Sequence, residues 1–177
     1  MATLPIDEPR VTVEEYLHTV YRPDCDYVEG HIEERNLGEY AHGMLQTLLA
    51  VLFTNNRAAW SVRAVTDVRM QVSPHRFRVP DVLVLRADAP REQILTHPPL
   101  IAIEILSPED RLSRFQARIN DYLAFGIEHI WIVDPEGRLA YTANSSGLHL
   151  AQSGELAIPG TPIRVVLSEL FAELDRA

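Results

Sequence analysis

Apolar side chains recur at helical spacing along the segment that begins at Glu39. The members of this stripe are Ala41, Leu45, Leu48, Leu49, Leu52 and Phe53. Their period predicts an amphipathic helix that ends near Asn55. Glu39, His42 and Gln46 fall together on another face of the same helix. The helix is therefore expected to pack one side against a core and to present a polar side elsewhere.

Three apolar segments after this helix have the length of β-strands. Apolar residues alternate across residues 61–72 with an interruption at Thr66, which predicts a strand with one buried face. Residues 77–85 are apolar enough for a central strand, and Pro80 inside them indicates a bulge, a strand start or an edge. Residues 100–106 contain a single carboxylate, Glu104, in an otherwise apolar run. This last segment predicts a buried strand.

A second long helix and several short elements follow. Residues 107–110 combine an N-cap serine, a proline at the first helical position and an acid three residues after the cap. The helix should end at Gly126, and residues 127–134 should form another strand. Later turn signals predict short strands and a C-terminal helix from about Ser168. The inward face of the second helix is expected to carry Leu112, Phe115, Ile119, Tyr122 and Leu123.

The N-terminal part adds a short helix and a hairpin. Thr12 and Glu15 have the spacing of a capping box, so a helix should run to about Val20. Residues 26–33 read as a hairpin that turns near Glu29 and Gly30. Between Glu39 and Asp134 the predicted order is helix, three strands, helix and strand, which is an α/β arrangement. At 177 residues the whole chain, 1–177, is expected to form one domain.

Composition narrows the classes of function. The chain has no run of about 18 apolar residues and no signal peptide at its start, so we expect a cytoplasmic protein without a membrane partner. Cys25 is the only cysteine, which excludes an intrachain disulfide and a thiolate metal cluster within one chain. The net charge of -9 argues against a surface coated for nucleic-acid binding but leaves room for a local basic cleft. The chain has 16 arginines and no lysine, so no mechanism can use a lysine.

Two acids stand out as candidate metal ligands. Asp81 lies in the second predicted strand after the helix, and Glu104 lies in the third. Neighbouring strands can bring such carboxylates together, where they repel each other unless a proton or cation intervenes. Hard oxygen ligands suit Mg²⁺ or Mn²⁺. The residues alone leave two other interpretations of Glu104 open: an edge-strand acid that faces solvent, or a buried acid paired with arginine.

Several motifs resemble the Uma-type restriction endonucleases, a bacterial branch of the PD-(D/E)XK nuclease superfamily. They are Tyr27–Gly30, Glu39 with His42, Val79–Val82, Glu104–Pro108, Tyr122, Gly126 and Trp131–Pro135. The resemblance implies a restriction-endonuclease-like core, with a mixed central sheet flanked by helices, an extra N-terminal hairpin and C-terminal strands. It also implies that Asp81 and Glu104 bind Mg²⁺ or Mn²⁺.

The chain departs from the superfamily pattern at the third catalytic position. Leu106 stands where the superfamily has a lysine, on the same face of the strand as Glu104. The resemblance places a basic residue on the next helix instead, and this residue is Arg118. Arg111 and Arg114 share its helical stripe, so the three could form a positive face toward the cleft or, for the first two, a solvated surface. Arginine could stabilise the transition state or position water, but it could not act as a general base.

Glu39 is a further candidate catalytic residue and His42 a candidate substrate-binding residue, while Gln71 and Arg78 are secondary candidates for substrate binding. Glu39 could supply a third carboxylate or a water bridge to the metal, or could simply be an acid at a helix N-terminus. His42 could bind phosphate or shuttle a proton, or could be structural. By resemblance, Gln71 and Arg78 could line the substrate cleft.

The expected function is a metal-dependent endonuclease that hydrolyses DNA phosphodiester bonds. An alternative is a noncatalytic module on the same fold that binds nucleic acid or a protein partner, and a third is an interaction domain unrelated to nucleic acid. The resemblance is also compatible with a homodimer.

Overall fold

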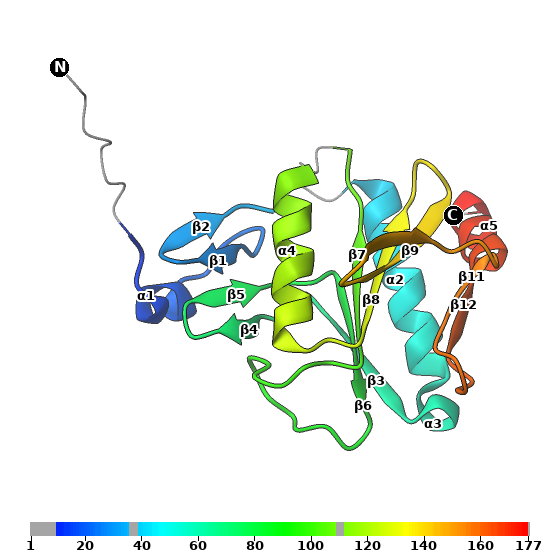
Figure 1. Ribbon diagram of the computed structural model, residues 1–177, viewed down its shortest axis with the longest axis horizontal. Helices are drawn as coiled ribbons and strands as arrows, with labels where there is room; N and C mark the ends of the chain where they lie inside the picture. Colours follow the sequence, from blue (N-terminus) through cyan, green and yellow to red (C-terminus); the bar gives the residue numbers. More distant parts are fainter. Residues whose placement is uncertain (1–9, 36–38, 109–111, 177) are drawn as a thin grey trace.

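The computed structural model describes residues 10–35, 39–108 and 112–176, and it contains two main sheets (Figure 1). The larger sheet has six strands in the order β10-β9-β8-β7-β6-β3. These strands are β3 (Val62–Thr66), β6 (Val82–Arg86), β7 (Ile101–Ile105), β8 (His129–Asp134), β9 (Leu139–Asn144) and β10 (Gly147–Leu150).

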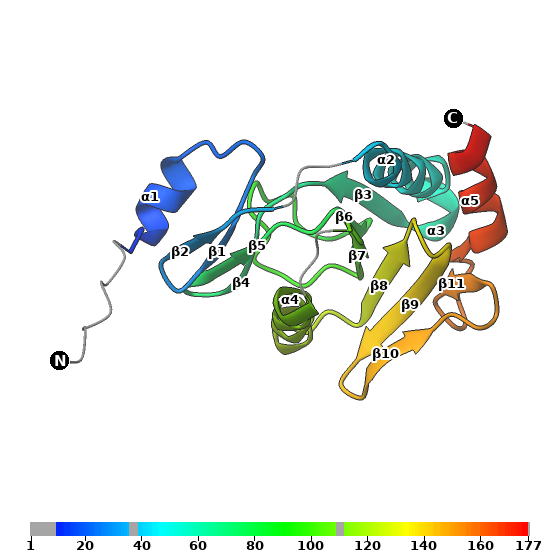
Figure 2. The same ribbon diagram turned by 90° about the horizontal axis from the view of Figure 1, so that it is seen from above.

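The larger sheet is mixed because one helical crossover joins two of its strands. Helix α4 (Leu112–Phe125) connects β7 to β8, which are parallel neighbours, whereas the other neighbouring strands are antiparallel. Parallel neighbours need such a crossover, while antiparallel ones can be joined by short turns. Figure 2 shows α4 on one face of the sheet and α2 (Tyr40–Asn55) with α5 (Leu167–Arg176) on the other. The predicted mixed sheet flanked by helices is confirmed.

Each face of the larger sheet has its own apolar core. The cluster beneath α2 and α5 includes Leu45, Leu49 and Phe53 together with Ile103 and Trp131 of the sheet. The cluster beneath α4 is built from the alternate strand positions and from the inward stripe of that helix. It includes Leu83, Ala102, Phe115, Ile119, Tyr122, Ile130 and Ile132. The period of two along β7 thus sends Ile103 to one core and Glu104 toward the side of α4.

The smaller sheet has four strands in the order β2-β1-β5-β4 and packs beside α1 (Val13–His18). Its strands are β1 (Asp26–Val28), β2 (His31–Glu33), β4 (Met70–Ser73) and β5 (Arg76–Arg78). Tyr16 of α1 stacks on Tyr27 of β1 with 5.0 Å between ring centroids, and it also contacts Phe77 of β5. This aromatic cluster joins the N-terminal helix to both hairpins of the sheet.

Several local predictions are confirmed. The capping box of α1 is present, since Thr12 Oγ1 accepts a hydrogen bond from the Glu15 amide and the Glu15 carboxylate accepts one from the Thr12 amide. The hairpin turns at Glu29 and Gly30, both at positive φ. Helix α2 spans the predicted segment, and α4 ends before Gly126, whose φ of 95° suits a glycine. The predicted start of α4 involves residues 109–111, which lie outside the described part of the chain.

Strands are present in both predicted segments, 61–72 and 77–85, and they break after Thr66 and around Pro80, where the sequence indicated an irregularity. The expectation of one strand in each segment is wrong. Each segment is divided between the two sheets: β3 and β6 belong to the larger one, and β4 and β5 belong to the smaller one. Asp67, at a φ of 52°, lies in the break between β3 and β4, and Pro80 lies in the break between β5 and β6. A residue with positive φ and a proline without an amide hydrogen both end regular pairing.

The remaining elements are short. They are α3 (Arg57–Trp60), β11 (Glu155–Ala157) and β12 (Arg164–Val166), and the last two pair with each other before α5. The short strands and the C-terminal helix agree with the sequence prediction. Within the described residues, none of the helices combines the length and apolar character that crossing a membrane requires.

Candidate active site

Asp81 and Glu104 lie side by side where the larger sheet meets the smaller one. Val82 of β6 pairs with Ile103 of β7 in antiparallel register, which places Asp81, directly before β6, opposite Glu104. Asp81 Oδ2 accepts a hydrogen bond of 2.7 Å from the backbone amide of Ile105. Each acid is only 2% exposed. The structure therefore brings together the two acids that the sequence singled out.

Helix α4 supplies the partners of Glu104. Arg118 Nη1 lies 2.7 Å from Glu104 Oε2, and the Tyr122 hydroxyl donates a hydrogen bond to Glu104 Oε1. Burial and the neighbouring charge of Asp81 raise the pKa of Glu104, although Arg118 and Tyr122 oppose the shift. Burial next to Glu104 also raises the pKa of Tyr122 well above its usual range, so its hydroxyl keeps its proton. In this structure Glu104 is a buried acid paired with arginine, one of the interpretations that the sequence left open.

Asp81 has a different set of partners. Arg35 Nη2 forms an ion pair with Asp81 Oδ1, and His42 Nε2 lies 3.3 Å from Asp81 Oδ2. Burial alone would raise the pKa of Asp81, but His42, Arg35 and the Ile105 amide together hold it below its ordinary value. In return, the hydrogen bond and charge of Asp81 raise the pKa of His42 despite partial burial. The two acids are thus tuned in opposite directions: Asp81 is the ionised member and Glu104 the one that holds a proton more readily.

Asp67, Gln46 and Arg35 extend the site beyond the predicted residues. Arg35 Nη1 pairs with Asp67 Oδ1 at 2.8 Å, so one guanidinium bridges Asp67 and Asp81. Gln46 Nε2 donates to Asp67 Oδ2 at 2.8 Å and to the Asp81 carbonyl at 2.9 Å. The helical spacing of Gln46 from His42 was a signal for its place on the same face. Arg35 and Asp67 lie in loops, and no periodic pattern pointed to them.

A buried ionic network lies behind the two acids. Arg78 of β5 is 1% exposed and contacts three carboxylates: those of Asp26 at 2.9 Å, Glu33 at 2.7 Å and Asp121 at 2.7 Å. Asp26 also lies 3.5 Å from Arg118 Nε. The network therefore ties the smaller sheet to α4 and supports Arg118 from the side away from Glu104.

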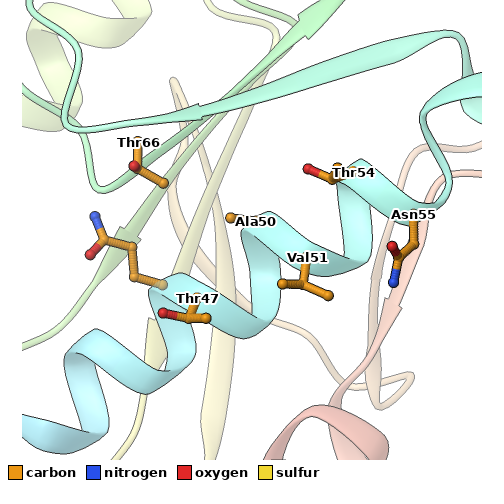
Figure 3. Close-up of a pocket in the computed structure, with 7 residues that line it drawn as sticks. Thr47, Ala50, Val51, Thr54, Asn55 and Thr66 are labelled. Carbon is orange, nitrogen blue, oxygen red and sulfur yellow. The ribbon is translucent and has the colours of Figure 1, made fainter.

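Asp81 and Glu104 line a polar pocket of about 180 Å³, called the acidic pocket below. Its lining includes Arg35, His42, Gln46, Asp67, Ser107 and Arg118 in addition to Asp81 and Glu104. Gln46 also borders a second pocket along α2, in which Thr47, Thr54, Asn55 and Thr66 surround Ala50 and Val51 (Figure 3). Glu39 is exposed, makes no capping hydrogen bond, and lines a third pocket that shares His42 and Ser107 with the acidic one. Glu39 therefore lies next to the acidic pocket but does not line it.

Three predicted substrate-binding positions do not line the acidic pocket. Arg78 lies behind it, buried among carboxylates that occupy its guanidinium. Gln71 lies on β4 of the smaller sheet, opposite Phe77. Arg114 is exposed on α4, as the solvated-face interpretation expected, and Arg111 lies outside the described residues. Arg78 does not line the pocket because it is buried, and Gln71 does not because the break after β3 places it in the smaller sheet. The sequence pattern showed neither the burial nor the change of sheet.

The acidic pocket fits a hard divalent cation with few protein ligands. The described residues contain no cluster of three or more His, Cys, Asp and Glu side chains that could hold a metal ion. Mg²⁺, however, is commonly bound through one or two carboxylates, with water and substrate phosphate as the other ligands. Asp81 and Glu104 provide such a pair of oxygen donors at the bottom of an open pocket. The set is suited to Mg²⁺ or Mn²⁺, provided that Arg35 yields an oxygen of Asp81.

Comparison with protein families gives one match over most of the chain. The model of the Uma2 family, described as "Putative restriction endonuclease", matches residues 13–156. These residues include both acids, the hairpins of the smaller sheet, α2 and α4. No curated protein matches the sequence.

Comparison with solved structures supports the fold. The crystal structure of a putative nuclease belonging to DUF820 from Anabaena variabilis superposes with a TM-score of 0.79. The match covers 93% of this chain and 99% of that one at 22% sequence identity, and it shows a restriction-endonuclease-like fold. The cryo-EM structure of a DrdV–DNA complex gives a TM-score of 0.38 at 17% identity, over 71% of this chain and 11% of that one. That second likeness is too low to support a conclusion.

Proposed function

The chain belongs to the Uma2 family of restriction-endonuclease-like proteins, and on this premise we propose that it is a metal-dependent endonuclease that hydrolyses phosphodiester bonds in DNA. The observation that carries the proposal is the placement of Asp81 opposite Glu104 at the bottom of an open pocket. Two buried carboxylates at one place repel each other, and in this structure Arg35 and Arg118 offset the repulsion. A bound Mg²⁺ or Mn²⁺ would offset it as well, which supports the proposal.

Asp81 and Glu104 would hold the metal ion. When bound, the ion would lower the pKa of a water molecule and neutralise charge on the scissile phosphate. Phosphodiester hydrolysis needs little covalent chemistry from the protein, so positioning and electrostatic stabilisation carry most of the catalysis. The absence of lysine from the chain is compatible with this division of work.

The surrounding residues position the acids and manage protons. Arg118 and Tyr122 fix both oxygens of Glu104 from α4. His42 lies against Asp81 and borders the pocket, where it could donate a proton to a phosphate oxygen or to a leaving group. Arg118 is lodged between Glu104 and Asp26, so its part is to orient Glu104 more than to contact substrate.

The proposal is tested by a cleavage assay with Mn²⁺ on supercoiled, linear duplex and single-stranded DNA. Asp81→Asn and Glu104→Gln should each lower the cleavage rate by about 100-fold or more, because each removes a carboxylate that would hold the metal ion at the reacting phosphate. Asp88→Asn and Glu173→Gln are matched controls, since both acids are exposed and neither lines the acidic pocket. Full cleavage by Glu104→Gln would show that the activity arises elsewhere.

A noncatalytic role on the same fold is the second candidate. The observation in its favour is that all four carboxylate oxygens of Asp81 and Glu104 already contact arginine, histidine, tyrosine or a backbone amide. Such a network could serve to hold the two sheets and α4 together. Calorimetry separates the two functions: Mn²⁺ binding that Asp81→Asn and Glu104→Gln abolish supports the nuclease, and no Mn²⁺ binding by the wild type supports the noncatalytic module.

A further inference from the structure

Arg35 lines the acidic pocket and pairs there with Oδ1 of Asp81. Its side chain is 15% exposed, and its two terminal nitrogens point to different carboxylates, Nη1 to Asp67 and Nη2 to Asp81. The pocket lining includes all three residues. Any divalent cation that uses Asp81 Oδ1 must therefore compete with Arg35.

Asp67 can hold Arg35 at the pocket when a cation displaces Arg35 from Asp81. It lies in the break between β3 and β4 at a φ of 52°, a conformation that costs free energy for a residue other than glycine. Gln46 bonds both Asp67 Oδ2 and the Asp81 carbonyl, which fixes the spacing between the two acids. Because Asp67 is 48% exposed, water solvates its charge, and its ion pair with Arg35 does not depend on the contact between Arg35 and Asp81.

The two arginines that line the pocket, Arg118 and Arg35, differ in how easily each can leave its carboxylate partner. Arg118 contacts Glu104 through Nη1 and lies beside Asp26 through Nε, and both of those acids are buried. Withdrawal of Arg118 from Glu104 would leave that buried carboxylate without its arginine, which is strongly unfavourable. The second partner of Arg118, Asp26, is buried outside the pocket lining and already pairs with Arg78, whereas Asp67 lines the pocket. Arg35 can release Asp81 and still keep an ion pair with Asp67. Arg35 is thus the arginine that can turn toward a ligand.

We propose that Arg35 has two alternating partners: it neutralises Asp81 in the metal-free protein and, tethered by Asp67, binds a substrate phosphate when Asp81 engages a metal ion. This inference rests on the proposed function. A guanidinium offers a planar fork that matches phosphate oxygens and remains charged throughout the pH range of proteins. Asp67 would then be a positioning residue for Arg35, and Gln46 a positioning residue for Asp67.

The test measures Mn²⁺ binding by calorimetry and binding of a fluorescent duplex DNA by anisotropy, the latter with Ca²⁺ in place of Mn²⁺. Arg35→Gln should bind Mn²⁺ about fivefold more tightly or better, because a competing cation is removed. The same variant should bind DNA about tenfold more weakly, because a charged phosphate contact is lost. A purely structural role for Arg35 would weaken both, and that result would overturn the proposal.

A double-mutant cycle tests the tether. Asp67→Asn should weaken Mn²⁺ binding, since Arg35 is left with Asp81 as its remaining carboxylate. In the Arg35→Gln background, Asp67→Asn should change Mn²⁺ affinity by less than about twofold. A full effect of Asp67→Asn in that background would make Asp67 itself a metal ligand and would contradict the tether. Arg86→Gln is the matched control, because Arg86 is exposed and pairs with Glu128 outside the pocket.

Failure of this inference is separable from failure of the proposed function. Loss of Mn²⁺ binding and cleavage in Asp81→Asn and Glu104→Gln would support the proposed nuclease function. If Arg35→Gln then leaves the Mn²⁺ and DNA affinities unchanged, the proposed role of Arg35 is rejected. If Arg35→Gln does not fold, judged by circular dichroism, Arg35→Lys replaces it. A lysine ammonium cannot bridge Asp67 and Asp81 with a planar fork, so tighter Mn²⁺ binding is again expected and weaker Mn²⁺ binding would overturn the proposal.

Discussion

The Tyr122 hydroxyl donates a hydrogen bond to the Glu104 carboxylate across the interface between α4 and the larger sheet. Tyr122 is fully buried, and it follows Arg118 by one helical turn, so a single face of α4 supplies both partners of Glu104. The helix that crosses from β7 to β8 is thereby tied to the acid on β7. Changes at this contact should affect stability and metal binding together.

Tyr122→Phe removes that hydroxyl and retains the ring. We expect the free energy of unfolding to fall by about 1–3 kcal/mol, because a buried carboxylate oxygen loses a hydrogen-bond donor. Urea unfolding followed by circular dichroism measures this change, with Tyr40→Phe as the control because Tyr40 is 65% exposed. Equal stabilities for Tyr122→Phe and Tyr40→Phe would show that the hydroxyl contributes nothing.

Glu104 should make stability depend on pH in a direction unusual for an acid. Its pKa is raised from 4.5 to about 7 by burial and by Asp81, so between these values the folded state binds a proton that the unfolded state has released. Stability from this group is therefore full below pH 4.5 and is lost as the pH rises through about 7.

The measurement compares the wild type with Glu104→Gln in EDTA at several pH values. The stability advantage of the wild type should shrink by an amount on the order of 3 kcal/mol across that interval. The comparison isolates Glu104 from the acid Asp81, whose lowered pKa contributes stability that disappears as the pH falls. A difference that stays constant or grows with pH would contradict the shift at Glu104.

Arg78→Ala should destabilise the protein severely. It breaks the buried pairs of Arg78 with Asp26 and Asp121, and the remaining arginines are the partly exposed Arg76 at Asp121 and Arg118, 3.5 Å from Asp26. We expect a loss of about 3–5 kcal/mol, as for a broken buried pair. Arg176→Ala is the control, because Arg176 is 72% exposed and its pair with Glu173 should contribute less than about 1 kcal/mol. Thermal or urea unfolding measures the loss of stability in both variants. A stable Arg78→Ala variant with weakened DNA binding would restore the predicted role of Arg78 in the cleft.

Mn²⁺ should protect the native state against unfolding. A ligand that binds the folded chain at 100 times its dissociation constant adds about 2.7 kcal/mol to the unfolding free energy. The thermal midpoint of the wild type should rise with Mn²⁺ concentration, and Asp81→Asn should lose this response. Asp88→Asn, which changes an exposed acid, should keep it. An equal rise in Asp81→Asn and the wild type would place the Mn²⁺ site elsewhere.

Much of the architecture could be predicted from local patterns. The capping box at Thr12, the hairpin turn at Gly30 and the helix end at Gly126 are short-range features, in which neighbouring residues set the backbone conformation. The apolar period of α2 likewise defined that helix. Strand membership could not be predicted in the same way, because residues 61–72 and 77–85 have patterns that either sheet could accept.

The two acids illustrate the boundary between sequence and tertiary structure. The type and order of residues sufficed to single out Asp81 and Glu104, since isolated carboxylates among apolar strand residues are costly unless partnered. Which partners they have depends on contacts between distant segments: Arg35 reaches Asp81 from a loop and also pairs with Asp67, whereas Arg78 lies in a buried network with Asp26. Ion pairing depends on distance and burial in three dimensions, and neither quantity is encoded in the spacing of residues along the chain.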